Sequence, residues 1–339
     1  MAYRPRTLLV WGSFSLLLLT GPGFSSDRFV PPHVPAASAT GVVASVRARA
    51  ERGLDPGLPA DTAALLTGMA LGDDSRMSKE TKNQFRRASL THLVAASGQN
   101  IALMLALALP LVGMFGLSLR ARLLVAVGLV AFYVPLAGGE APIRRAAVMA
   151  LATMAGKLRG RPADAWHALG LAGVITLLLD RNSSQSLGWQ LSFVAVAGML
   201  ALGPPLQRGL VRLGCPELIA EAIAATVSAT VATTPVIAWK VGRLSLAAIP
   251  ANLLAAPAVA PAMWLGLGGS AMAQVSQAVA APFAYAAAVP VSCLLELAQL
   301  FGKPSWASVP WKPSGEAVLV MLGVLALGAG MLGRSRSEA

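Results

Sequence analysis

The chain has 339 residues, of which 55% are hydrophobic and only 12% are charged, and its mean hydropathy is +0.65. Charged residues make up about a quarter of an ordinary soluble domain, so this composition excludes that class. The apolar residues suffice for about nine transmembrane helices of about 20 residues each. The sequence therefore predicts an all-α polytopic membrane protein.

The charge balance is strongly basic, with 27 Lys and Arg against 15 Asp and Glu, or a net charge of +12. Such an excess favours nucleic acid or anionic lipid as a partner, but the cytoplasmic loops of membrane proteins are basic as well. The sign of the charge alone therefore identifies no partner. Two cysteines and three scattered histidines predict neither a disulfide framework nor a metal centre, and we expect no cofactor.

The N-terminal region begins with an apolar run at residues 7–20, which is either a short first span (a signal anchor) or the core of a cleaved signal peptide. Residues 21–59 are rich in Pro, Gly, Ser and Ala and predict a short extracytoplasmic linker. Residues 60–88 break at Gly72-Asp73-Asp74 and continue as a charged stretch. We expect a hairpin of short helices at the membrane interface there.

Nine further apolar segments bring the expected number of spans to about ten. The segment at 146–157 is short for a span, and Pro282 and Pro290 interrupt the one at 279–301, so whether these two cross fully stays open. The segments are residues 90–115, 123–137, 146–157, 165–179, 187–206, 218–239, 244–272, 279–301 and 318–332.

Basic residues predict the orientation, because Lys and Arg favour short cytoplasmic loops. With the N-terminus inside, the larger basic set falls on the cytoplasmic face. This set includes Arg120, Arg122, Arg208, Arg212 and the terminal Arg334 and Arg336. Both termini are therefore predicted to be cytoplasmic, unless residues 7–20 are cleaved and the new N-terminus is extracytoplasmic.

Polar residues open the apolar segment at 90–115. His92, Ser97, Gly98 and Asn100 lie within its first residues, and Ser97-Gly98 is a weak point for a helix. Buried polar groups need hydrogen-bond partners, so they face either neighbouring helices or a water-filled path. From the residues alone, helix packing is the simpler interpretation.

A pair of arginines, Arg144 and Arg145, precedes the short segment at 146–157. A guanidinium pairs with phosphate through two hydrogen bonds, so the pair could hold a permeating strand. Snorkelling of the two side chains to the interface, as anchors of the helix end, is the interpretation that their spacing alone favours.

Two more clusters place polar residues or prolines in apolar segments. Gln190 and Ser192 lie at the start of the segment at 187–206. Pro235 lies near the end of the next segment, and Pro250 with Asn252 lies near the start of the one after. Proline removes a backbone donor, so we expect these two helices to be kinked or unwound.

An enzymatic role has little support in the sequence. Ser97-Gly98 with a histidine elsewhere is the outline of a rhomboid-like serine protease, but Ala95 and Ala96 precede the serine where that family has Gly-x-Ser-Gly. The chain also has no GxxxxGK[ST] loop for ATP hydrolysis by that route.

Four motifs in order resemble the ComEC/Rec2-like competence family of bacterial DNA-uptake channels. They span roughly residues 62–270. The segments that carry the resemblance are Leu65–Asp73 with Phe85 and Leu90–Gly98; Arg145–Met149; Gln190–Val196; and Thr233–Pro235 with Pro250–Leu254.

The resemblance implies an inner-membrane channel that passes single-stranded DNA to the cytoplasm during natural transformation. It implies partners as well: a DNA receptor, a separate nuclease and a cytoplasmic motor ATPase, besides membrane lipids. The polar path would be lined by residues from all four motifs. These are Asp73, His92, Ser97, Gly98, Asn100, Arg144, Arg145, Gln190, Ser192, Pro235, Pro250 and Asn252.

The sequence departs from the family at several points. Ser89 stands where the family usually has glycine, and Gln99-Asn100 where it often has Leu-His. The metallo-β-lactamase motif His-x-His-x-Asp-His is absent. We therefore expect the non-enzymatic channel half, with a channel domain at 60–272 and additional spans and a basic tail at 273–339. The alternative is a relative without DNA uptake that transports a small solute or supports the envelope. A homo-oligomeric channel stays open.

Overall fold

The computed structural model describes residues 41–94, 97–139, 141–158 and 164–334. Within these ranges the chain is almost entirely helical, with thirteen α-helices (α2–α14) and two three-residue strands. The all-α fold predicted from the sequence is confirmed. The apolar run at 7–20 and most of the linker at 21–59 lie outside the described residues.

The chain divides into two compact units. Of the described residues, the first unit holds Asp164–Ile249 and those from Ser308 onward, whereas the second holds those up to 158 and Pro250–Ala307. Residues 41–59 and 273–307 group with the second unit, and residues 164–249 group with the first.

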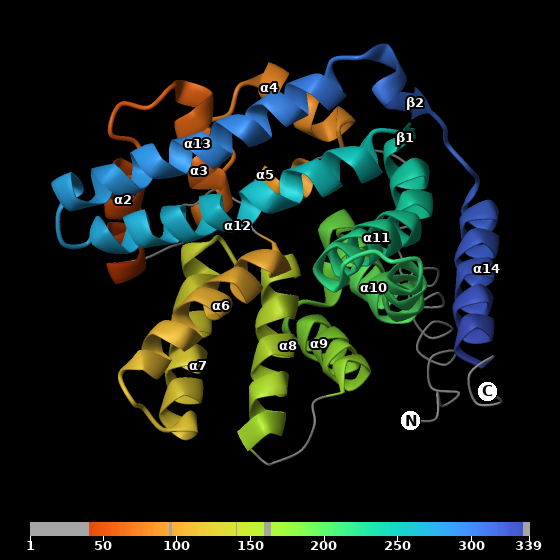
Figure 1. The fold of residues 1–339 in the computed structure, drawn as a ribbon, viewed down its shortest axis with the longest axis horizontal. Coiled ribbons are helices and arrows are strands. Elements are labelled where there is room, and N and C mark those ends of the chain that lie inside the picture. Colours follow the sequence, from red (N-terminus) through yellow and green to blue (C-terminus); the bar gives the residue numbers. More distant parts are fainter. Residues whose placement is uncertain (1–40, 95–96, 140, 159–163, 335–339) are drawn as a thin grey trace. The chain divides into compact units, whose positions relative to one another are not determined.

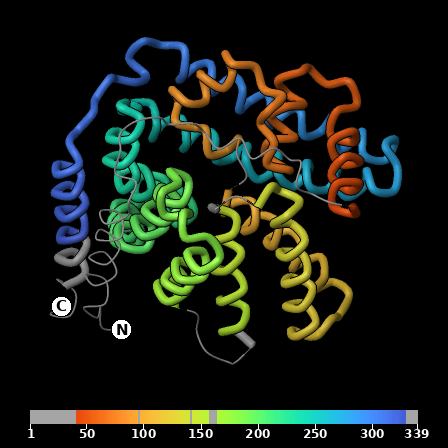
Figure 2. Tube along the Cα trace, turned by 180° about the vertical axis from the view of Figure 1, so that it is seen from behind, coloured from red at the N-terminus to blue at the C-terminus, as the bar shows by residue number. Residues whose placement is uncertain are grey.

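The described residues of the second unit form nine helices, and its apolar helices run in more than one direction. In Figures 1 and 2, α12 and α13 lie side by side across the ends of α6, α7 and α8. Apolar segments counted in the sequence are therefore not a set of parallel rods. The helices are α2 (Val42–Gly53), α3 (Ala60–Leu71), α4 (Lys79–Arg87), α5 (Thr91–Val94), α6 (Gly98–Met114), α7 (Leu119–Leu136), α8 (Ala141–Leu158), α12 (Ala248–Met272) and α13 (Gln277–Gly302).

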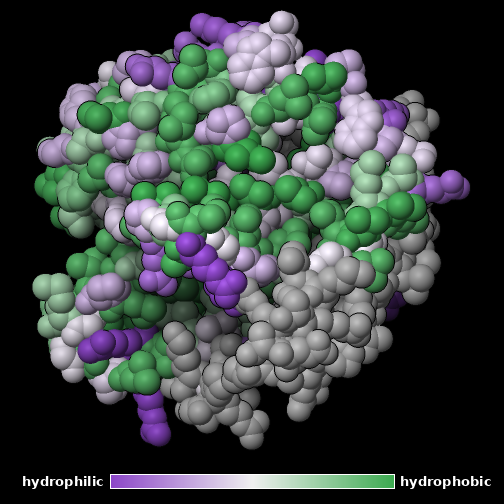
Figure 3. Space-filling view, turned by 45° about the vertical axis from the view of Figure 1, so that its right-hand side comes forward, coloured by the Kyte–Doolittle hydropathy of each residue, from purple (hydrophilic) through white to green (hydrophobic). Residues whose placement is uncertain are grey.

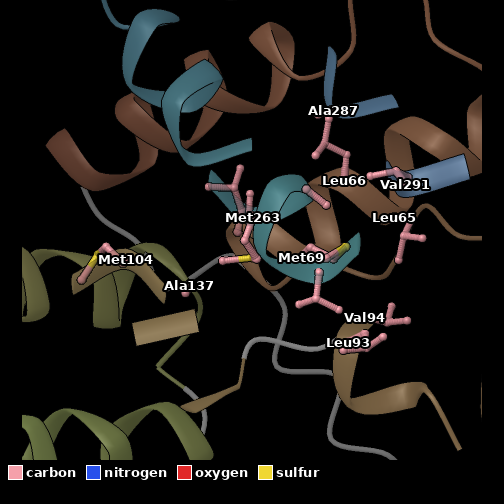
Figure 4. Close-up of a cluster of buried hydrophobic side chains, with 14 of the residues drawn as sticks. Leu65, Leu66, Met69, Leu93, Val94, Met104, Ala137, Met263, Ala287 and Val291 are labelled. Atoms are coloured by element: carbon pink, nitrogen blue, oxygen red, sulfur yellow. The ribbon is translucent and has the colours of Figure 1, made fainter. Parts of the chain in front are cut away.

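A core of aliphatic side chains holds this unit around α3. Leu65, Leu66 and Met69 of α3 are at most 1% exposed. Figure 4 shows them beside Met263 of α12 and Val291 of α13. Because α3 is buried on almost every side, it is an internal helix and does not lie on the surface as an interfacial hairpin would.

The first unit is a helical group closed by a small antiparallel sheet, in which Leu244 pairs with Val309. Its helices α10 and α11 touch at Gly198, where a larger side chain would collide with the Cβ of Ala232 and the carbonyl of Ser228. The elements are α9 (Ala165–Leu179), the 3₁₀ turn Arg181–Gln185, α10 (Leu187–Arg212), α11 (Glu217–Val241), β1 (Arg243–Ser245), β2 (Ser308–Pro310) and α14 (Gly315–Arg334).

Several helix boundaries correct the sequence-based expectations. Helix α13 continues through Pro282 and Pro290, so the segment whose full crossing the sequence left open is one 26-residue helix. Helix α11 likewise continues through Pro235 and is not unwound. Pro250 is the third residue of α12, where a backbone donor has no helical partner in any case. Helix α8 starts at Ala141 and reaches 18 residues.

Five described helices are long and apolar enough to cross a membrane: α7, α10, α11, α12 and α13. Helices α3, α6, α9 and α14 are apolar as well, but their apolar stretches have only 10–17 residues. Large hydrophobic side chains are exposed on several of these helices, and Figure 3 shows how much of one face they cover. An apolar surface of this extent is expected of a protein that faces lipid.

Candidate channel-lining site

The turn between α4 and α5 is held in an unusual backbone conformation. Ser89 has φ 61°, the left-handed region that favours glycine. The backbone N–H of Leu90 donates to the carbonyl of Phe85 at 2.8 Å, and both side chains are fully buried. This is the helix ending that a left-handed residue permits. It explains physically why glycine would suit this position.

Asn100 lies at the centre of a buried polar network at the start of α6. Its amide donates to the carbonyl of Met69 at 2.8 Å, and its Oδ1 accepts from the hydroxyl of Ser97 at 3.0 Å. The hydroxyl of Tyr133, on α7, donates to the carbonyl of Ala70 at 3.0 Å. The last carbonyls of a helix lack partners within it, and here side chains from two other helices supply them for α3.

Gly98, the first residue of α6, lies directly against Arg145 of α8. A Cβ added to Gly98 would lie 2.5 Å from Nη2 of Arg145 and 3.0 Å from the Cβ of Ala146. A larger residue at position 98 would therefore displace the guanidinium of Arg145 and crowd Ala146.

The two arginines of α8 have different surroundings. Arg145 is only 6% exposed, because it packs against Gly98. Arg144 is half-buried, and its buried Nε has no hydrogen-bond partner among the described residues. Adjacent residues point about 100° apart around a helix, so Arg144 cannot share the position of Arg145. Arg144 is the more exposed of the two side chains.

Asn252 links α12 to the same region. Its amide donates to the carbonyl of Ser89 at 3.4 Å, across 163 positions of the sequence. Pro250 lies half a turn away in the first turn of α12 and is exposed. The structure thus brings Asn252 to the turn that precedes the polar residues of α6.

The histidines do not support a serine-protease centre. His92 on α5 is exposed, and Ser97 donates its hydroxyl to Asn100. His167, in the other unit, has its Nδ1 2.7 Å from a carboxylate oxygen of Asp164. Among the described residues no group of three or more His, Cys, Asp and Glu side chains could hold a metal ion.

Asp73 lies in a charged cluster that the sequence did not reveal. Its carboxylate accepts from the backbone N–H of Ser75 at 2.9 Å and lies 3.4 Å from Nη2 of Arg47. Burial acts to raise the pKa of Asp73, but the hydrogen bonds from Ser75 and the charge of Arg47 outweigh it and lower that pKa below its ordinary value. Arg47 also donates to the carbonyl of Leu136 at 2.8 Å, so it joins α2 to the ends of α3 and α7.

Comparison with known proteins decides the family. The profile of the family described as "Competence protein" matches residues 69–337, well over half of the chain. The chain belongs to this competence-protein family. Two curated relatives match as well: "ComE operon protein 3" of Bacillus subtilis, 22% identical over 59% of this chain, and "Uncharacterized protein YcaI" of Escherichia coli, 30% identical over 71% of it.

The competence-family chain spans only a quarter to a third of the length of these relatives, 25% and 34% respectively. No solved structure matches it. The activity of these longer relatives is therefore not assigned to this chain.

The competence-family motifs fall into both units. In the second unit the structure brings together the first motif, through Ser89 and Gly98, with the second, through Arg145, and with part of the fourth, through Asn252. The third motif, with Gln190 and Ser192, lies on α10 in the first unit, as does Pro235 on α11. Gln190 is buried and donates to the carbonyl of Ser184 at 2.8 Å, which orders the turn before α10.

Sequence reasoning missed Tyr133 and gave no role to Arg47, which both organise the site in the second unit, and it missed Thr176 in the first unit. Thr176 accepts a 3.0 Å hydrogen bond from the indole of Trp189 and so fixes α9 against α10. Arg47 lies in a segment that was interpreted as a linker. The signal available in the sequence was the helical spacing of Arg47 and Glu51, which are four residues apart. In the structure the Nε of Arg47 donates to the carboxylate of Glu51 at 2.9 Å.

Proposed function

We propose that this chain is the channel half of a DNA-uptake system in the bacterial cytoplasmic membrane and passes single-stranded DNA to the cytoplasm. The chain conducts the strand passively and performs no covalent chemistry. A DNA receptor, a separate nuclease and a motor ATPase act with it. Membership of the competence family supports the general role.

The observation that carries the proposal is the approach of Arg145 to Gly98. A buried guanidinium and a buried amide network meet where α6 begins, in a chain whose surface is largely apolar. Burying charged and polar groups in a membrane protein carries a large cost in free energy unless other polar groups surround them. Such a place is suited to a wet path for a polyanion.

Within this site Arg144 is the residue proposed to contact the strand. Arg145 is packed into the protein and positions the start of α6, whereas Arg144 is half-buried and so the more exposed of the two. A guanidinium recognises phosphate by two parallel hydrogen bonds. Asn100 and Ser97, bonded to one another, hold the neighbouring backbone and are positioning residues.

Deletion of the gene in a naturally transformable host tests this proposal. Labelled double-stranded DNA is supplied, and the fraction that becomes resistant to external nuclease in the cytoplasm is measured. We expect uptake to fall to background and to return when the intact gene is supplied. Unchanged uptake in the deletion strain would overturn the channel and would favour a solute-transport or structural role.

A further inference from the structure

The C-terminal ends of α4 and α13 form a basic surface outside the site described above. The residue after α13, Lys303, follows Gly302, which lies so close to the backbone of Gln84 on α4 that a Cβ there would collide with it. Arg87 Nη2 donates to the carbonyl of Pro304 at 2.7 Å. These two contacts fix the ends of the helices together.

Cations lie along α4, from Lys79 in its first turn to Arg86 in its last, and Lys303 and Trp306 follow the C-terminal end of α13; together we call these residues the basic rim. Lys79, Arg86 and Lys303 are exposed, and none of the three pairs with a carboxylate among the described residues. Trp306, two residues beyond Pro304, is 52% exposed. The rim consists of Lys79, Lys82, Arg86, Arg87, Lys303 and Trp306.

The local charge is positive on balance, although Asp61 accepts a 2.6 Å hydrogen bond from the hydroxyl of Thr81 in the first turn of α4. Helix α4 carries four cations, and its one acidic residue, Glu80, accepts a 3.0 Å hydrogen bond from Gln84. Lys82 is 3.4 Å from Asp74. Placing cations at the last turn of a helix offsets its dipole, and this accounts for Arg86 and Arg87 but not for Lys79 in the first turn.

The α4 part of the rim exposes no apolar face that could insert into lipid. A helix that lies in a membrane surface has an exposed apolar face. The apolar side of α4 instead packs inside the protein, where Phe85 is fully buried. Among the described residues from 43 to 94, no large hydrophobic side chain is exposed. By contrast, α13 exposes Val279, Tyr285, Val289 and Leu300.

We propose that the basic rim is a docking surface for single-stranded nucleic acid, on which phosphates contact Lys79, Arg86 and Lys303 and a base stacks on Trp306. Cations combined with an exposed aromatic ring are the means by which proteins bind a single strand without reading its sequence. The inference rests on the proposed DNA-uptake function and adds to it a first contact away from Arg144.

Binding of labelled oligothymidylate to the full-length protein, held in phosphatidylcholine nanodiscs, tests the rim. In the triple variant Lys79→Gln, Arg86→Gln, Lys303→Gln, we expect the Kd to rise about tenfold or more, and the slope of log K against log salt to shrink by about 2, since each lost phosphate contact removes about 0.7. Arg87 is left intact because it bonds Pro304. Trp306→Ala should weaken binding about fivefold or more, while Trp306→Phe keeps most of it.

The matched control removes the same charge from exposed arginines elsewhere: Arg120→Gln, Arg181→Gln, Arg212→Gln. We expect it to bind as the wild type does. Wild-type affinity in the rim variant, or an equal loss in the control, would overturn the inference. So would a rim variant that binds the oligonucleotide normally but copurifies with less phosphatidylglycerol, which would make the rim a lipid contact.

The two proposals fail separately. If the rim variant loses oligonucleotide binding while deletion of the gene leaves DNA uptake unchanged, the rim stands and the channel is wrong. If deletion abolishes uptake while the rim variant binds oligonucleotide as the wild type does, the channel stands and the rim is wrong.

Discussion

Gly98 at the start of α6 and Arg145 on α8 lie in direct contact, since a Cβ on Gly98 would be 2.5 Å from the guanidinium Nη2. The two residues are 47 positions apart in the sequence and belong to different family motifs. Their contact explains why a glycine opens an otherwise apolar helix. It also distinguishes the two arginines of α8, since Arg145 is 6% exposed and Arg144 is half-buried.

Substitution of Gly98 by alanine should displace Arg145 or the start of α6. We expect a loss of about 1–3 kcal/mol in unfolding free energy, the usual result of adding atoms to a packed site. Gly128→Ala is the control, because Gly128 on α7 has nothing within 4 Å of an added Cβ and alanine favours a helix by about 0.5–1 kcal/mol. Thermal unfolding in detergent measures both. Equal stability of the two variants would contradict the contact.

Two tyrosines that donate to backbone carbonyls offer a matched pair. Tyr133→Phe removes the donor to Ala70, and both residues are buried. We expect it to reduce the unfolding free energy by about 1–3 kcal/mol, because a buried carbonyl loses its partner. Tyr285→Phe removes a 3.0 Å bond to Pro56 at an exposed position, where water replaces it. A smaller effect at Tyr133 than at Tyr285 would disprove the capping role.

Ser89→Gly should stabilise the protein. The left-handed backbone of Ser89 disfavours any residue with a Cβ by about 1–2 kcal/mol, and part of that strain is relieved by glycine. Ser89→Ala keeps the Cβ and should give no gain. Denaturation of the three proteins side by side checks this, and a gain with alanine as large as with glycine would show that the hydroxyl and not the backbone matters.

The ion pair of Asp73 with Arg47 should make stability depend on pH. Because the pKa of Asp73 is lowered in the folded protein, its contribution is fully present above its unfolded pKa of about 3.9 and is lost as the pH falls through the folded value. Asp73→Asn should therefore be less stable than the wild type at pH 7, with a difference that shrinks below about pH 4. Asp55→Asn, at the more exposed pair with Arg76, should change stability little at either pH. If the stability difference between the wild type and Asp73→Asn stayed constant down to acid pH, the ion pair would not be its cause.

The sequence predicted the helical character and many boundaries, because composition and apolar runs report them directly. Residues 165–179 are one example, identical in prediction and structure. It did not predict that α13 runs unbroken through Pro282 and Pro290, since packing inside the protein can hold a helix that proline alone would interrupt.

Long-range contacts between side chains could not be predicted from the sequence either. His92 and Asn100 looked equivalent in the sequence, yet one is exposed and the other is 6% exposed with three polar neighbours. Arg144 and Arg145 likewise differ only through what α6 places beside them. Such differences arise from tertiary packing, and no local pattern encodes them.

Photo-crosslinking of DNA in transit tests the central claim most directly. Val148 lies one turn beyond Arg144 on α8 and is half-buried, so a photoreactive amino acid there leaves both arginines in place. In cells that are taking up labelled DNA, the account predicts a covalent adduct between this chain and the transported single strand. Normal uptake without any adduct at position 148, while the same amino acid at another position of the chain does give one, would contradict the account.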